Sequence, residues 1–171
     1  MPIALKDAKH ARCSCGKVEM EVLGPPIVSG VCYCDDCQTG ARQIEALPNA
    51  PRMMDPDGGT QVVLFRKDRI RCTKGAELLK AYRLVEKTAT NRMVATCCNT
   101  SMTMTFDDSR HWIPVFRGRL NGDAPPLQMR ICTKFKPEGV TLSGDVPSYP
   151  GYPPVMMWML VKAWIPMLMG R

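Results

Sequence analysis

The chain has 171 residues, of which 45% are hydrophobic, and this length suits one domain with a buried core. Its formal net charge is +7, but the basic residues are scattered and are not interleaved with aromatic residues, which argues against a nucleic-acid-binding protein. Residues 1–12 lack the apolar run of a signal peptide, so we predict a cytoplasmic protein with reduced thiols.

Short β-strands dominate the predicted secondary structure. In residues 17–23, Val18, Met20 and Val22 alternate with charged residues, a pattern typical of a strand with one buried face. Fifteen prolines and 13 glycines favour many turns, and we predict a mainly β fold, either a sandwich or an open barrel. The other predicted strands lie at residues 27–32, 61–66, 78–85 and 101–106, and around Leu127, Met129 and Ile131.

One long segment between predicted strands is polar. Residues 38–59 are rich in proline and glycine, which predicts a loop with at most one short helical turn. Loops of this length in compact domains are often functional, so we interpret this segment as a candidate lid over a neighbouring site.

The C-terminal part differs in composition from the rest of the chain. The apolar stretch at residues 155–169 is too short to span a membrane comfortably, and it contains Lys162. Trp158 and Trp164 suit a membrane–water interface, so the segment either packs on the body or on a partner protein, or lies peripherally on a membrane. The predicted organisation is a β domain at residues 1–147, a linker at 148–154 and an apolar helix at 155–171.

Nine cysteines form the most informative pattern. Clustered cysteines in a reducing compartment are metal ligands more often than disulfides, and an odd number cannot pair completely. Cys32, Cys34 and Cys37 form a C-x-C-x-x-C motif that one loop can gather on a single Zn²⁺. Three thiolates leave one vertex for water or substrate, as in catalytic zinc sites, unless a fourth residue closes a structural site. The candidates for that residue are Cys72, Cys132 and His111.

Two further cysteine pairs each precede an alternating segment. Cys13 and Cys15 stand before the strand at residues 17–23, and Cys97 and Cys98 stand before the one at residues 101–106. Brought together, the pairs supply four thiolates to a closed structural site. Neighbouring side chains on an extended chain point apart, so either Cys98 binds alone or a turn lets both adjacent cysteines bind.

The remaining cysteines and the two histidines have no partner at metal-ligand spacing. We predict that Cys72 and Cys132 pack as small hydrophobes, and that His10 and His111 are surface or hydrogen-bonded residues. The predicted metal ligands are Cys13, Cys15, Cys32, Cys34, Cys37, Cys97 and Cys98.

These motifs together resemble the family of glutathione-dependent formaldehyde-activating enzymes and centromere protein V. That family has C-x-C-G, C-x-C-x-x-C and C-x-x-C-G-[ST] in this order. The chain has CSCG at residues 13–16 and CYCDDC at residues 32–37, and the resemblance extends over residues 12–120.

Other positions both support this resemblance and depart from it. Leu79, Tyr82 and Arg92 fall where the family has similar residues. In the third motif Ala95 stands where the family has a cysteine, and Cys97 is the candidate to replace it.

The resemblance implies a β-tent fold of small antiparallel sheets, a structural zinc at the outer motifs and a second zinc at the middle motif. It also implies a carbon–sulfur lyase that adds glutathione to formaldehyde, giving S-hydroxymethylglutathione, with Cys32, Cys34 and Cys37 as its catalytic metal ligands. The expected partners are a thiol such as glutathione and a small carbonyl compound. The alternative is a non-catalytic zinc module for scaffolding, because similarity of fold does not assign chemistry.

Overall fold

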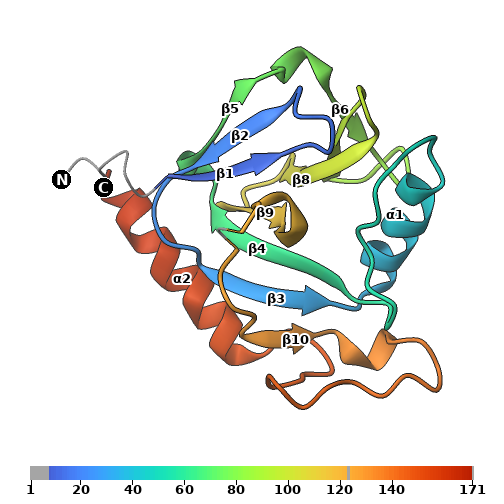
Figure 1. Ribbon diagram of the computed structural model, residues 1–171. Helices are drawn as coiled ribbons and strands as arrows, with labels where there is room; N and C mark the ends of the chain where they lie inside the picture. The colour runs from blue at the N-terminus through green and yellow to red at the C-terminus, as the bar shows by residue number, and fades with distance from the viewer. Residues whose placement is uncertain (1–7, 123, 171) are drawn as a thin grey trace.

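The computed structural model describes residues 8–122 and 124–170, and it is mainly β, with two sheets and two α-helices (Figure 1). The first seven residues, which form part of the segment expected to lack a signal peptide, lie outside this range. The smaller sheet has the order β1-β2-β5, and its strands are β1 (Lys9–Arg12), β2 (Glu19–Val22) and β5 (Ile70–Lys74). The larger sheet has the order β10-β3-β4-β9-β8-β7-β6.

The larger sheet has seven strands and is antiparallel except where β10 pairs with β3. The mainly β class and the C-terminal helix are therefore confirmed, although this sheet is larger than the small antiparallel sheets that were expected. Its strands are β3 (Val28–Cys32), β4 (Thr60–Arg66), β6 (Leu79–Tyr82), β7 (Thr90–Ala95), β8 (Thr100–Phe106), β9 (Trp112–Phe116) and β10 (Met129–Ile131), and the helices are α1 (Asp35–Glu45) and α2 (Pro154–Leu168).

At strands β3 and β4, both faces of the larger sheet are buried, because the two sets of alternating side chains enter different cores. In β4, Val63 and Phe65 pack with residues of the smaller sheet. Val62 and Leu64 point to the opposite face and pack in a second core that includes Met156 and Leu160 of α2. This explains why residues 61–66 form an almost continuous apolar run rather than a strict alternation.

Helix α1 corrects the expectation of a long loop at residues 38–59, because the first part of that segment is helical. The backbone N–H of Cys37 donates to the Cys34 sulfur, which acts as the N-cap at 3.4 Å. Asp35 and Asp36 lie in the first turn, where their negative charges interact favourably with the positive end of the helix dipole and stabilise the helix. Ala41 and Ile44 are fully buried, so two apolar side chains hold a helix whose other side is polar, a pattern too sparse to stand out in the sequence.

Helix α2 lies across the molecule from α1 and covers the second core (Figure 1). Met156 and Leu160 are buried, whereas much of the outer surface of the helix is exposed and apolar. The segment before α2 runs beside β10, where the Tyr149 N–H donates to the Arg130 carbonyl at 2.9 Å. Within the described residues, neither helix combines the length and the hydrophobicity needed to cross a membrane.

Candidate metal centres and the adjoining pocket

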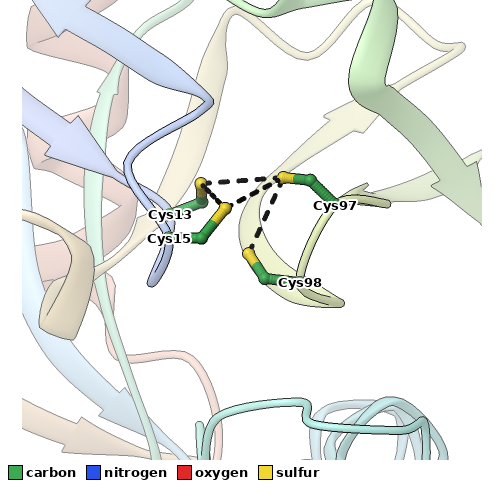
Figure 2. Close-up of side chains that lie close together, drawn as sticks. All are labelled: Cys13, Cys15, Cys97 and Cys98. Atoms are coloured by element: carbon green, nitrogen blue, oxygen red, sulfur yellow. Dashed lines mark hydrogen bonds between the residues drawn. The ribbon is translucent and has the colours of Figure 1, made fainter.

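Four cysteines from two distant parts of the chain converge at the turn between β1 and β2 (Figure 2). We call them the outer cysteine group, and they are Cys13, Cys15, Cys97 and Cys98. Their sulfur atoms all lie within 4.8 Å of one another. The Cys13–Cys15, Cys13–Cys97, Cys15–Cys97 and Cys97–Cys98 sulfur pairs are separated by 3.6, 3.9, 3.4 and 3.8 Å. A tetrahedral ion with metal–sulfur bonds of about 2.3 Å keeps its ligand sulfurs about 3.8 Å apart, so this group could hold one metal ion.

Two turns bring these four thiols together. After β1, the Gly16 N–H donates to the Cys13 carbonyl at 3.0 Å, and Gly16 has φ +74°, which a glycine adopts without strain. Residues 96–99 form the turn between β7 and β8, where Asn99 has φ 51°. The turn places both Cys97 and Cys98 in the outer cysteine group, so their adjacency does not prevent both thiols from converging.

Polar neighbours stabilise negative charge on the outer cysteine group. The Val18 N–H donates to the Cys13 sulfur at 3.2 Å. Burial raises the pKa of Cys98, but hydrogen bonds from Ser14 and Thr100 outweigh it and lower the pKa to about 5. Burial raises the pKa of Cys97 to about 12. Binding of a metal by these cysteines would release the protons that its ligands still carry.

The middle motif forms a second set, the inner cysteine group, whose sulfurs also lie within 4.8 Å of one another. Cys32 ends β3, Cys34 caps α1, and Cys37 lies in the first turn of that helix. The change from strand to helix within six residues is what directs the three side chains to one point. The inner cysteine group could therefore also hold a metal ion.

The inner cysteine group lies where negative charge is favoured. Hydrogen bonds from Cys32 and then Cys37 lower the pKa of Cys34 to about 3, assisted by the Cys37 backbone N–H and the charge of Arg92. Hydrogen bonding to Cys132, Cys34 and Cys37 and burial raise the pKa of Cys32. The positive end of the α1 dipole acts in the same direction as Arg92, since thiolates are stabilised at helix N-termini.

Arg92 is a cation buried beside these thiols. It is 3% exposed, and its guanidinium donates to the Asp36 carbonyl at 2.7 Å. None of the carboxylates in residues 8–122 and 124–170 forms a salt bridge with it. Any side chain at position 40 would collide with Arg92, because a Cβ there would lie 2.3 Å from the Arg92 Nε. Gly40 therefore allows Arg92 to pack closely against α1. Because a buried charge needs a counter-charge, the thiolate of Cys34 is the natural partner of Arg92.

The three candidates for a fourth ligand are placed differently. Cys72 lies in β5 and bonds the Glu19 and Lys74 carbonyls, and the His111 Nε2 lies 2.7 Å from the Leu160 carbonyl. Cys132 is buried, follows β10 with φ 58°, and hydrogen-bonds with the Cys32 thiol. It nevertheless lies outside the set of sulfurs that are mutually within 4.8 Å. Among the described residues, the inner cysteine group therefore has three converging thiols and not four.

The positions of Cys132 and Arg92 beside the inner cysteine group follow from the tertiary structure and not from their spacing in the sequence. The β10–β3 pairing aligns Ile131 with Cys32 and so delivers the next residue, Cys132, to the inner cysteine group. Cys132 has no cysteine neighbour in the sequence, and Arg92 was notable only for the family resemblance. Cys72 packs against the core between the two sheets, as predicted for a small hydrophobe.

A pocket of about 340 Å³, the α2 pocket, opens beside the inner cysteine group. Cys32, Cys34 and Cys37 all line it, and so does Arg92. Its other walls come from β3, β4, β7, β8, β9, β10 and α2, and Asp36 of α1 also lines it. Pockets of a few hundred Å³ are large enough for small-molecule ligands, and this one gives such a ligand direct access to the three thiols.

The chain belongs to the family DUF6151, described as a family of unknown function, whose model matches residues 6–118. The matched range contains both cysteine groups and ends before β10, Cys132 and α2. A crystal structure of a Rhodobacter sphaeroides protein, a structural-genomics target, is similar at 19% identity and a TM-score of 0.47, over 81% of this chain and 98% of that one. No curated protein is significantly similar to the chain.

Proposed function

We propose that the protein is a zinc-dependent enzyme of the carbon–sulfur lyase type, which adds a thiol such as glutathione to formaldehyde or a similar small carbonyl compound. One observation carries this proposal. The three thiols of the inner cysteine group line a pocket that can admit a ligand, and the resemblance of the CSCG and CYCDDC motifs to formaldehyde-activating enzymes supports the same assignment.

The cysteine ligands favour zinc in both groups. Thiolate-rich tetrahedral sites are typical of Zn²⁺. In this proposal the outer cysteine group holds a structural ion with four protein ligands, and the inner cysteine group holds a second ion with three. When bound, that second ion lowers the pKa of a coordinated thiol and polarises a carbonyl group.

The chain's own residues contribute position and charge. Cys32, Cys34 and Cys37 fix one end of the α2 pocket, and Arg92 balances part of the charge of their thiolates. Both reactants are then held close together in a pocket that limits the access of water, which favours their combination. The thiol sulfur bonds to the carbonyl carbon, and the thiol proton ends on the carbonyl oxygen.

The test is exchange spectroscopy of a mixture of glutathione and formaldehyde. We expect zinc-loaded protein to accelerate exchange between free glutathione and its S-hydroxymethyl adduct. Cys34→Ser should abolish the acceleration, and Cys72→Ser, a cysteine variant far from the α2 pocket, should retain it. Fully zinc-loaded protein that accelerates exchange for none of several thiols and aldehydes would contradict the proposal.

A second candidate function rests on α2. In this alternative the protein is a non-catalytic zinc module that docks on an anionic lipid surface. Lys162 is the one charged residue of α2, and with Arg66 and Arg69 it lines a shallow groove beside the helix. Tryptophans with nearby cations are typical of interfacial helices. The exposed apolar side chains of α2 are Val155, Met157, Trp158, Val161, Trp164, Ile165 and Leu168.

Sedimentation with lipid vesicles tests this candidate. We expect binding to vesicles that contain phosphatidylserine, and weaker binding for Lys162→Glu and for the double variant Trp158→Ala, Trp164→Ala. Val85→Ala is the control, because Val85 is also an exposed apolar residue but lies outside α2. Absence of the protein from the vesicle pellet, or self-association through α2 instead, would reject the membrane assignment.

A further inference from the structure

The α2 pocket is apolar over most of its wall. The floor is one face of the larger sheet, where alternate residues such as Val62, Leu64 and Met104 project into the pocket. The opposite wall is α2, which contributes Met156, Met157 and Leu160. Methionine side chains adapt to varied apolar shapes, so this wall suits a hydrocarbon body.

Among the described residues that line the pocket, the charged side chains without a salt bridge are Arg92 and Asp36, and both lie at the end that holds the inner cysteine group. Arg92 lies there, next to Cys34 and Cys37. Arg110 also lines the pocket, but its guanidinium forms an ion pair with Asp108 and stacks 3.6 Å from the centre of the Phe106 ring. The pocket therefore has one polar end and a long apolar remainder.

We propose that the α2 pocket selects a thiol with an apolar body, whose sulfur lies at the inner cysteine group and whose hydrocarbon part lies between the sheet and α2. This inference rests on the proposed function and narrows its substrate class. The product is the corresponding S-hydroxyalkyl adduct: the thiol sulfur bonds to the carbonyl carbon, and the thiol proton ends on the carbonyl oxygen.

The alternative ligand, glutathione, fits this wall poorly. Its two carboxylates and its ammonium group need polar partners, because transfer of an unpaired charge into apolar surroundings is costly. Arg92 can serve one carboxylate at most, and Arg110 is already paired with Asp108. The Asp36 carboxylate at the same end of the pocket can serve the ammonium group but repels the second carboxylate. An alkyl or benzyl thiol has no such groups and buries its carbon atoms against Val62, Leu64 and Leu160.

A series of alkyl thiols tests the inference. Ethanethiol, butanethiol and hexanethiol are compared with glutathione in two measurements on zinc-loaded protein, namely binding by calorimetry and acceleration of adduct formation with formaldehyde. Each added methylene that enters the apolar pocket should strengthen binding about fourfold. Hexanethiol, with four more methylenes, should therefore bind roughly two hundredfold more tightly than ethanethiol, and more tightly than glutathione.

A pair of variants places the effect in the pocket. Met157 and Ile165 are both 47% exposed residues of α2, but only Met157 lines the α2 pocket. Met157→Glu should reduce the affinity for hexanethiol at least about tenfold and leave the affinity for ethanethiol nearly unchanged. Ile165→Glu should change neither. Equal effects of the two variants would overturn the placement of the hydrocarbon part.

The two measurements separate this inference from the proposed function. If glutathione binds and reacts as well as hexanethiol, and affinity does not rise with chain length, the apolar-thiol inference is wrong and the proposed reaction stands. If affinity rises with chain length but no thiol reacts, the pocket assignment holds and the proposed reaction is wrong.

Discussion

The two cysteine groups differ in how far apart their members lie in the sequence. The outer cysteine group joins Cys15 to Cys97 across 82 positions, whereas the inner cysteine group spans only Cys32 to Cys37. An ion at the outer group would close a long loop and hold the first turn of the smaller sheet to the β7–β8 turn. Closing a longer loop removes more conformational entropy from the unfolded chain than closing a short one. An ion at the inner group would hold only one strand-to-helix corner, so its loss leaves most of the fold intact.

The two groups also differ in how readily a ligand can reach their thiols. The outer cysteine group has four converging thiols, and the inner cysteine group has three that line the α2 pocket. A complete shell of protein ligands suits a structural ion, and an incomplete shell suits exchange with a ligand. The contrast shows that the fold decides how many thiols converge, and it predicts a structural role for the group of four and exchange with a ligand for the group of three.

The largest expected effect comes from breaking the outer cysteine group. Cys98→Ser and Cys15→Ser should each lower the free energy of unfolding by about 3 kcal/mol or more, because structural zinc contributes about 10–16 kcal/mol to folding. Metal content should fall by one ion at the same time. Denaturant unfolding combined with metal analysis measures both, and Cys72→Ser serves as the control. Variants with normal stability and full metal content would show that the outer group is not structural.

Breaking the inner cysteine group should affect metal content far more than stability. Cys34→Ser should remove one ion and change the free energy of unfolding by less than about 1.5 kcal/mol, within the range of ordinary single substitutions. In the unaltered protein, a chelator titration should remove one ion readily and the second slowly. If both ions leave in a single step, or if the slow ion is the one that Cys34→Ser abolishes, the contrast between the groups fails.

Arg92 offers a finer way to change the inner cysteine group without touching a thiol. Arg92→Met removes the cation beside Cys34 and Cys37 and should weaken metal binding there about 10- to 100-fold, as loss of groups around metal ligands typically does. Metal binding at the outer cysteine group should stay unchanged. Competition with a chromogenic chelator measures the two affinities, and Arg83→Met, an exposed arginine that pairs with Asp107, is the control. An unchanged inner affinity would mean that Arg92 acts only in packing.

The smallest expected effect concerns the turn that presents Cys97 and Cys98. Asn99 has φ 51° and donates to the Pro48 carbonyl at 2.9 Å. Both Asn99→Gly and Asn99→Ala remove that hydrogen bond, but only alanine is strained at this φ. Asn99→Ala should therefore be about 1 kcal/mol less stable than Asn99→Gly. Thermal unfolding of the two variants gives the difference, and equal stability would show that the turn relaxes without cost.

Local patterns in the sequence were sufficient for several features. The alternation of Val18, Met20 and Val22 predicted β2, because one buried face of a strand imposes a period of two. The spacing of Cys32, Cys34 and Cys37 predicted one convergent group, because residues so close in the chain can meet whatever the rest of the fold does. The apolar C-terminal stretch predicted a helix, which α2 confirms.

Other features depended on contacts between distant segments. The meeting of Cys13 and Cys15 with Cys97 and Cys98 was an inference from two similar corners, and only the packing of the two sheets fixed it. Helix α1 was missed because its stability comes from a sulfur N-cap and a buried Ile44 rather than from a repeated apolar pattern. Strands β1, β5, β7 and β9 were missed because they are short or lack simple alternation, and their neighbours in the sheets define them.

The sequence by itself determined where cysteines lie close together, because cysteines three or fewer positions apart remain near one another in almost any conformation. Only the tertiary structure decided how many thiols each group has and what surrounds them. The β10–β3 pairing brings Cys132 to Cys32 but leaves it outside the three converging sulfurs. The packing of α1 against β7 buries Arg92 beside the same thiols, and α2 completes the apolar pocket. These arrangements arise from burial of apolar surface between segments far apart in the chain, a driving force without direction that no local spacing encodes.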